Sequence, residues 1–170
     1  MSINNQFQVT STEFGHKGHI PPKYTCEGDN VNPPLLFRNI PEGTRSLALI
    51  IEDPDAPKGV FDHWICWNIS PNEAIAERSN PGINGTNSFG KTGYGGPCPP
   101  SGEHRYYFKI FALDAQLDLP AGAGKKELLD AMKGHELATA ELMGRYQKHK
   151  HAVAMSFERH EPVGADEKSQ

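Results

Sequence analysis

The segment Asp53-Pro54-Asp55-Ala56-Pro57 constrains the fold more than any other part of the sequence. It directly follows the apolar run at residues 46–52, which predicts a fully buried strand. Proline fixes the backbone angle φ and removes an amide donor, so the segment cannot be an interior strand and is expected to form a rigid loop. Its carboxylates are therefore held at the carboxyl end of a strand. The sequence leaves open whether an X-Pro bond here is cis.

The rest of the chain predicts short strands joined by turns. Strands are expected at residues 7–11, 35–37, 64–69, 105–113 and 152–158. Asn84-Gly85 is typical of a hairpin turn, and the Gly- and Pro-rich residues 90–100 predict an ordered loop. An apolar stripe at helical spacing over residues 124–147 predicts helix, which Gly134 divides in two. This order predicts a mainly antiparallel β fold, a sandwich with C-terminal helices.

Length and charge narrow the class of protein. A chain of 170 residues fits one domain, residues 1–170, with a core of its own. The formal net charge of −4 argues against a nucleic-acid partner, because such proteins need a clustered basic face. No apolar run approaches membrane-spanning length, so membrane insertion is not expected.

The cysteines and the N-terminus bear on the compartment. Cys26, Cys66 and Cys98 are odd in number and widely spaced, which predicts reduced thiols rather than a disulfide framework or a zinc site. Residues 1–10 lack the basic and apolar regions of a secretory signal. A cytoplasmic location is therefore expected, and no cofactor is expected.

Four polar residues lie where strands meet Pro- or Gly-rich loops: Asp53, Asp55, His63 and His104. One interpretation is an anion pocket, in which the Gly95-Gly96-Pro97 backbone approaches a ligand closely and the histidines donate to phosphate-like oxygens. Protonation of a histidine near neutral pH would strengthen such a site. The alternative is that the aspartates only accept hydrogen bonds from loop amides, as in Asx turns.

The same residues are also compatible with two other chemistries. Two histidines and a carboxylate could form a three-ligand metal site, but no His or Cys pair has metal-binding spacing. Ser101 or Cys98 beside His104 could act as a nucleophile. Ser101 lies outside a strand-to-helix elbow, and no basic residue beside Cys98 in sequence argues for a lowered thiol pKa. Catalytic and metal residues are therefore not expected.

The chain resembles the phosphatidylethanolamine-binding proteins in two separate motifs. The first combines Asp53-Pro54-Asp55-Ala56-Pro57 with His63-Trp64 and Asn68, and the second runs from Gly95-Gly96-Pro97 to Gly102-Glu103-His104-Arg105-Tyr106. The resemblance extends over residues 7–157 and is closer to the bacterial and archaeal branch called Raf kinase inhibitor-like proteins.

This resemblance implies a central antiparallel sheet, a second smaller sheet, C-terminal helices and a pocket for phosphate-like groups such as the phosphoethanolamine headgroup. It also implies a homodimer. Carried over by position, the ligand-binding residues would be Asp53, Asp55, Ala56, Pro57, Phe61, His63, Gly95, Gly96, Pro97, His104 and Tyr106. After the Gly-Pro step the chain departs from eukaryotic members with Cys98-Pro99-Pro100-Ser101-Gly102. Lipid specificity and kinase inhibition are therefore not carried over.

The expected function is that of a small binding protein without a catalytic cycle. Its ligand would be a small anion or a phosphorylated partner, with regulation of signalling as the implied role. One alternative is an inhibitor that docks on a kinase or protease through the same loops. An alternative of another class is a hydrolase that uses the His/Asp cluster.

Overall fold

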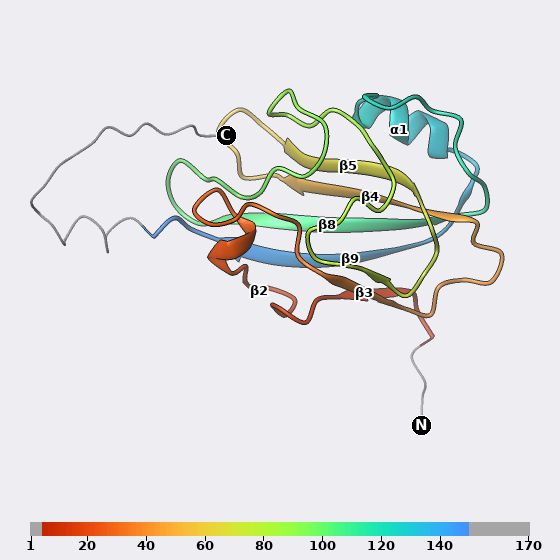
Figure 1. Ribbon diagram of the computed structural model, residues 1–170, viewed down its shortest axis with the longest axis horizontal. Helices are drawn as coiled ribbons and strands as arrows, with labels where there is room; N and C mark the ends of the chain where they lie inside the picture. Colours follow the sequence, from red (N-terminus) through yellow and green to blue (C-terminus); the bar gives the residue numbers. More distant parts are fainter. Residues whose placement is uncertain (1–4, 150–170) are drawn as a thin grey trace, which may run out of the picture.

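The computed structural model of the chain describes residues 5–149, which form two β-sheets and one α-helix (Figure 1). The larger sheet has the strand order β2-β9-β8-β4-β5-β7, and the smaller has the order β1-β3-β6. Among the strands of residues 5–149, only β2 and β9 pair in parallel. These strands, with the 3₁₀ helix η1 and the helix α1, are β1 (Gln8–Thr10), β2 (Gly18–His19), η1 (Pro22–Tyr24), β3 (Leu35–Arg38), β4 (Ser46–Asp53), β5 (Phe61–Ile69), β6 (Ala74–Ile75), β7 (Ile83–Asn84), β8 (His104–Leu113), α1 (Lys125–Met132) and β9 (Glu136–Tyr146). The mainly β, two-sheet prediction is confirmed.

Strand β4 lies in the middle of the larger sheet, between β5 and β8. Leu47 and Leu49 join the core on one face, whereas Ala48 and Ile50 join the core on the other. Because successive side chains of a strand point to opposite faces, burial of both faces requires a continuous apolar run. The predicted buried strand at residues 46–52 is therefore confirmed.

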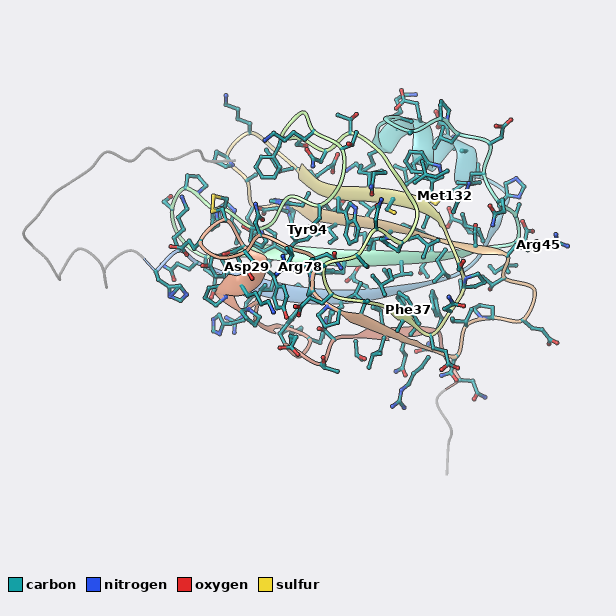
Figure 2. The ribbon with its side chains drawn as sticks, in the orientation of Figure 1. Asp29, Phe37, Arg45, Arg78, Tyr94 and Met132 are labelled. Atoms are coloured by element: carbon teal, nitrogen blue, oxygen red, sulfur yellow. A yellow bond between two sulfur atoms is a disulfide. The ribbon has the colours of Figure 1, made fainter. Side chains whose placement is uncertain are left out.

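The larger sheet separates two hydrophobic cores. One core lies between the sheets and includes Phe37, while the other lies beneath α1 and includes Met132. Figure 2 labels both residues, which lie on opposite sides of the larger sheet. No helix of the described residues is long and apolar enough to cross a membrane.

The C-terminal part holds less helix than the sequence predicted. α1 ends at Met132, Gly134 has a φ of +84°, and Glu136–Tyr146 is the strand β9. This strand pairs with β8 along nearly its whole length, so a long-range ladder overrides the helix propensity of its Glu, Leu and Ala residues. Gly144 suits the strand because a Cβ there would lie 2.5 Å from the Ile20 side chain. The prediction of helix over residues 135–147 is wrong.

Three further predictions have different outcomes. Asn84-Gly85 forms no hairpin turn: Asn84 belongs to β7, and the Gly85 amide donates to the Ile65 carbonyl at 2.7 Å. The described residues contain no cis peptide bond, so the X-Pro bonds of the Asp-Pro loop are trans. The strand predicted at residues 152–158 lies outside the described residues.

Cys26 and Cys98 form a disulfide. The prediction of reduced thiols is therefore wrong for these two residues, which lie 72 residues apart in the sequence and meet only in the folded chain. Cys66 is free and buried in the core between the sheets. Burial raises the pKa of its thiol to about 12.

Candidate functional site

The polar residues converge because β4 runs antiparallel to both of its neighbours. Its last residue, Asp53, therefore lies opposite Phe61 at the start of β5, and β8 begins nearby with His104. The Nδ1–H group of His104 donates to Oδ2 of Asp53 at 2.6 Å, and both side chains are buried. A hydrogen bond of this kind offsets the free-energy cost of burying polar side chains.

Asp53 also shapes the loop that follows it. Its Oδ1 atom accepts a hydrogen bond from the Asp55 amide at 2.7 Å, which is an Asx turn. The Asp55 carboxylate accepts from the Arg105 guanidinium at 2.8 and 2.9 Å and from the Arg105 amide. These hydrogen bonds from Arg105 lower the pKa of Asp55. The interpretation that an aspartate accepts a hydrogen bond from a loop amide thus applies to Oδ1 of Asp53, whereas Oδ2 pairs with His104.

His63 is fully buried beside this pair. Its Nδ1 atom lies 2.7 Å from the Gly95 carbonyl, and because a carbonyl only accepts, Nδ1 carries the hydrogen. Within the described residues its Nε2 atom has no hydrogen-bond partner. Burial lowers the pKa of His63 from 6.5 to about 4, so the ring is neutral near pH 7. In the ligand-free protein His63 is therefore not the protonated histidine that would strengthen an anion site near neutral pH.

A cavity of about 950 Å³ opens beside His63. Its wall includes Phe61 and Phe89, whose ring centroids lie 5.0 and 5.4 Å from that of His63. The loop after β4, the segment from Asn87 to Gly96 and both disulfide cysteines complete it. Lys58 and Lys91 are the only charged residues among the described residues that line the cavity. The wall thus carries positive charge and apolar surface.

Two of the glycines in the wall, Gly95 and Gly96, are required by packing. A Cβ at Gly95 would lie 2.6 Å from the Phe89 ring, and a Cβ at Gly96 would lie 2.3 Å from the Tyr24 carbonyl oxygen. Their amides are already engaged, since Gly95 donates to the His63 carbonyl and Gly96 to Oδ1 of Asn30. These glycines therefore allow the wall to pack closely, and their amide hydrogens are not free to bind a ligand.

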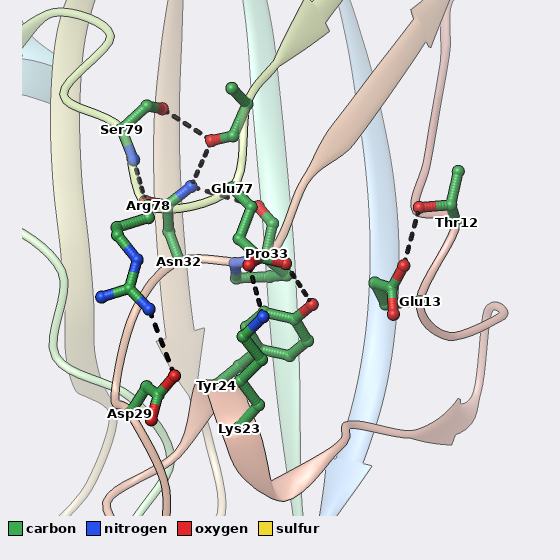
Figure 3. A network of polar contacts seen from close by, with 11 residues as sticks. Thr12, Glu13, Lys23, Tyr24, Asp29, Asn32, Pro33, Glu77, Arg78 and Ser79 are labelled. Carbon is green, nitrogen blue, oxygen red and sulfur yellow. Dashed lines mark hydrogen bonds and ion pairs between the residues drawn. The ribbon is translucent and has the colours of Figure 1, made fainter.

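A polar network supports the loop that carries Cys26 (Figure 3). The Tyr24 hydroxyl donates to Glu77 at 2.6 Å, and Lys23 forms an ion pair with the same carboxylate. Arg78 pairs with Asp29 at 3.2 Å. The Cys26 amide also donates to the Pro97 carbonyl, next to the disulfide. The network and the disulfide together hold this loop against the part of the cavity wall that contains Gly95 and Gly96.

A family model described as phosphatidylethanolamine-binding protein matches residues 10–147. The chain belongs to the phosphatidylethanolamine-binding protein family. A protein named UPF0098 from Methanothermobacter thermautotrophicus is 46% identical over 79% of this chain and 95% of its own length. A second UPF0098 protein, from Pyrococcus abyssi, is 48% identical over 81% of this chain and 84% of its own length.

Solved structures agree with this family assignment. The crystal structure of CT736, a phosphatidylethanolamine-binding protein homologue from Chlamydia trachomatis, has a TM-score of 0.83 at 45% identity and covers 85% of this chain and 99% of its own. Escherichia coli YbcL, described as a member of the mammalian family, has a TM-score of 0.77 at 30% identity and covers 84% of this chain and 99% of its own.

The structure of this family member separates the eleven predicted site residues into groups. Five line the cavity: Ala56, Pro57, Phe61, Gly95 and Gly96. Four form the buried cluster beside it: Asp53, His63, His104 and Tyr106. The other two have roles outside the wall, because Asp55 binds Arg105 and the Pro97 carbonyl accepts from Cys26.

Sequence reasoning missed several wall residues of this family member. Lys58 directly follows the Asp-Pro motif, and its position beside predicted pocket residues was an available signal. Lys91, Phe89, Asn30 and Cys26 also line the cavity. Cys26 and Asn30 precede the Asp-Pro motif by more than twenty residues, so no local pattern indicates their place.

The structure also provides observations on the nucleophile and metal-site alternatives. The disulfide occupies the Cys98 sulfur, so Cys98 is not a free thiol nucleophile. Among the described residues no group of three His, Cys, Asp or Glu side chains is arranged to hold a metal ion.

Proposed function

We propose that this protein binds a small phosphate-like anion in the cavity beside His63, as a binding protein without a catalytic cycle. The charge of the cavity carries the proposal. The whole chain has a net charge of −4, yet the described residues that line the cavity include two lysines and no carboxylate. A local positive surface on an acidic protein favours an anionic ligand.

In this proposal His63, which contacts Phe61 and Phe89 of the wall but does not itself line the cavity, supplies a hydrogen-bond acceptor to the bound anion. Its Nδ1–H is engaged by Gly95, so in the neutral ring the buried Nε2 atom has only a lone pair to offer. A phosphate group that still carries a proton can donate a hydrogen bond from its O–H group to Nε2. Lys58 and Lys91 would neutralise the negative charge of the phosphate. Binding therefore favours the protonated form of the phosphate group, and affinity falls as pH rises and that proton is lost.

A second candidate function is docking of a phosphorylated protein partner. Val60 and Phe89 line the same cavity and remain 52% and 37% exposed, which is high for large apolar side chains. A partner could cover this apolar surface while its phosphate entered the cavity. Docking on a kinase or protease remains an alternative from the sequence, and a homodimer and a cytoplasmic location remain predictions.

The first experiment is a titration with inorganic phosphate, followed by amide chemical shifts. We expect saturable shifts at Ala56 and Gly95 in the wild type and affinity reduced about tenfold or more in His63→Asn, because a buried acceptor is lost. Asparagine keeps an amide donor near the Nδ1 position and removes the Nε2 position. His135→Asn, at an exposed histidine paired with Asp114, is the matched control.

Two results would contradict the proposal. One is the absence of saturable shifts in the wild type, and the other is wild-type affinity in a folded His63→Asn variant. Repeating the titration at higher pH checks the proton requirement, since affinity should fall. Turnover of phosphate esters that disappears in the same variant would favour the hydrolase alternative.

A further inference from the structure

The acidic residues that lie next in sequence to the cavity-lining residues 56–61 each form an ion pair with another side chain. Asp53 pairs with His104 at 2.6 Å, and Asp55 pairs with Arg105 at 2.8 Å. Asp62, at the start of β5, forms an ion pair with Lys125 of α1 at 2.8 Å. None of these carboxylates is therefore available to neutralise a cation inside the cavity.

The two lysines that line the cavity differ from these carboxylates in their ion pairing. Within residues 5–149 neither Lys58 nor Lys91 forms an ion pair, although both are exposed and line the cavity. Their ammonium groups therefore add net positive charge at its mouth. A ligand that supplied a second negative charge would meet both groups without displacing an existing partner.

The backbone at both lysines is held in place. The Gly59 amide, next to Lys58, donates to the Ala56 carbonyl at 3.2 Å and closes a turn. Oδ1 of Asn87 accepts from the amides of Phe89 and Lys91, and the Ser88 amide donates to the Asp62 carbonyl at 2.8 Å. The first loop is thus closed by its own turn and the second is fixed to the start of β5, so the lysine side chains are the parts that reorient around a ligand.

This arrangement discriminates between two classes of phosphate ester. A zwitterionic ester such as phosphoethanolamine would bring an ammonium group toward two lysines with no carboxylate beside it. An ester with a second anionic group would bring opposite charge to the same place. Specificity is a difference of affinities, so repulsion of one class matters as much as attraction of the other.

We propose that Lys58 and Lys91 make the cavity selective for phosphate esters that carry a second anionic group over zwitterionic phosphate esters. The proposal rests on the proposed anion-binding function and names the ligand class of that site. The competing arrangement uses the rings of Phe61 and Phe89, which could hold an ammonium group by cation–π contact. The two arrangements predict opposite preferences.

Phosphoglycolate and phosphoethanolamine form a matched pair of probes. Each joins a phosphate ester to a two-carbon chain, which ends in a carboxylate in the first and an ammonium in the second. By calorimetry we expect phosphoglycolate to bind about tenfold more tightly than phosphoethanolamine, because two exposed cations each add a modest favourable interaction. In the double variant Lys58→Gln/Lys91→Gln the affinities should become nearly equal.

Lys126→Gln is the matched control. It removes the same charge from an exposed lysine on α1, whose partner is Asp130, and should leave the preference unchanged. Equal or tighter binding of phosphoethanolamine by the wild type overturns the selectivity while leaving anion binding intact. A preference that persists in the double variant overturns the role of the lysines. If inorganic phosphate also fails to bind the wild type, the proposed function falls with it.

Discussion

His63 illustrates how a single residue acquires its chemistry from its surroundings. Its ring lies among Phe61, Phe89 and Tyr106, and its Nδ1 hydrogen is fixed by Gly95. Removing an imidazolium from water is costly, so burial keeps the ring neutral. The same burial that prepares Nε2 as an acceptor also makes the folded protein sensitive to acid.

The stability of the protein should therefore depend on pH through His63. Its pKa is about 4 in the folded state and near 6.5 when exposed, so the unfolded state binds the proton more readily. The contribution is fully present above pH 6.5 and is lost as pH falls toward 4. That difference corresponds to a decrease of about 3 kcal/mol in the free energy of unfolding.

Urea unfolding at a series of pH values measures this dependence. His63→Asn should flatten the curve between about pH 4 and 6.5, since the titrating group is removed. His135→Asn should keep the wild-type slope. A His63→Asn curve that runs parallel to the wild type would show that another group causes the acid sensitivity.

At the scale of elements, the site depends on loops that the sheet alone does not hold. The loop after η1 and the loop before β8 meet through the Cys26–Cys98 disulfide and through the hydrogen bond from the Cys26 amide to Pro97. Both cysteines line the cavity. The disulfide therefore links a distant segment to the cavity wall.

Reduction of this disulfide should destabilise the protein. A crosslink between residues 72 apart restricts the unfolded chain, so we expect its loss to lower the free energy of unfolding by about 2–4 kcal/mol. The reduced wild type and the Cys26→Ser/Cys98→Ser variant should behave alike in urea unfolding. The reductant should have no effect on that variant, because its one remaining cysteine, Cys66, is a free thiol and leaves no disulfide to reduce. Full reduction, verified by thiol counting, without loss of stability would contradict the prediction.

At the scale of the whole molecule, the net charge and the cavity have opposite signs. A chain of net charge −4 repels anions at long range, whereas Lys58 and Lys91 attract them at the cavity. Salt screens both effects, and the sign of its influence on affinity shows which one dominates. Because a bound anion is closer to the lysines than to most carboxylates, the local attraction should dominate.

Affinity for inorganic phosphate should therefore fall with increasing ionic strength. The fall should be clear above about 0.1 M, where the Debye length is near 10 Å. Calorimetric titrations over a salt series measure it, and the double variant Lys58→Gln/Lys91→Gln should show a shallower dependence. Affinity that rises with salt would mean that the net negative charge of the chain governs anion binding.

Parts of the fold that depend on local pattern are predictable from the amino-acid sequence. The apolar runs that became β4, β5 and β8 bury residues on the sheet, and their period and composition identify strands regardless of their partners. The Asp-Pro loop could be placed at a strand end for the same reason. Asp53, His63 and His104 were therefore found as a group, since each lies at the end of a strand that could be recognised.

Other features depend on distant partners and arise only in the folded chain. Residues 136–146 became a strand because β8 offered an edge to pair with, and Cys26 met Cys98 because folding brought two remote loops together. The engagement of Asp55 and Asp62 by distant cations left Lys58 and Lys91 as the charge of the cavity. Burial likewise fixed the protonation of His63. These properties arise from the surroundings of a residue, which are set by long-range contacts that no local pattern contains.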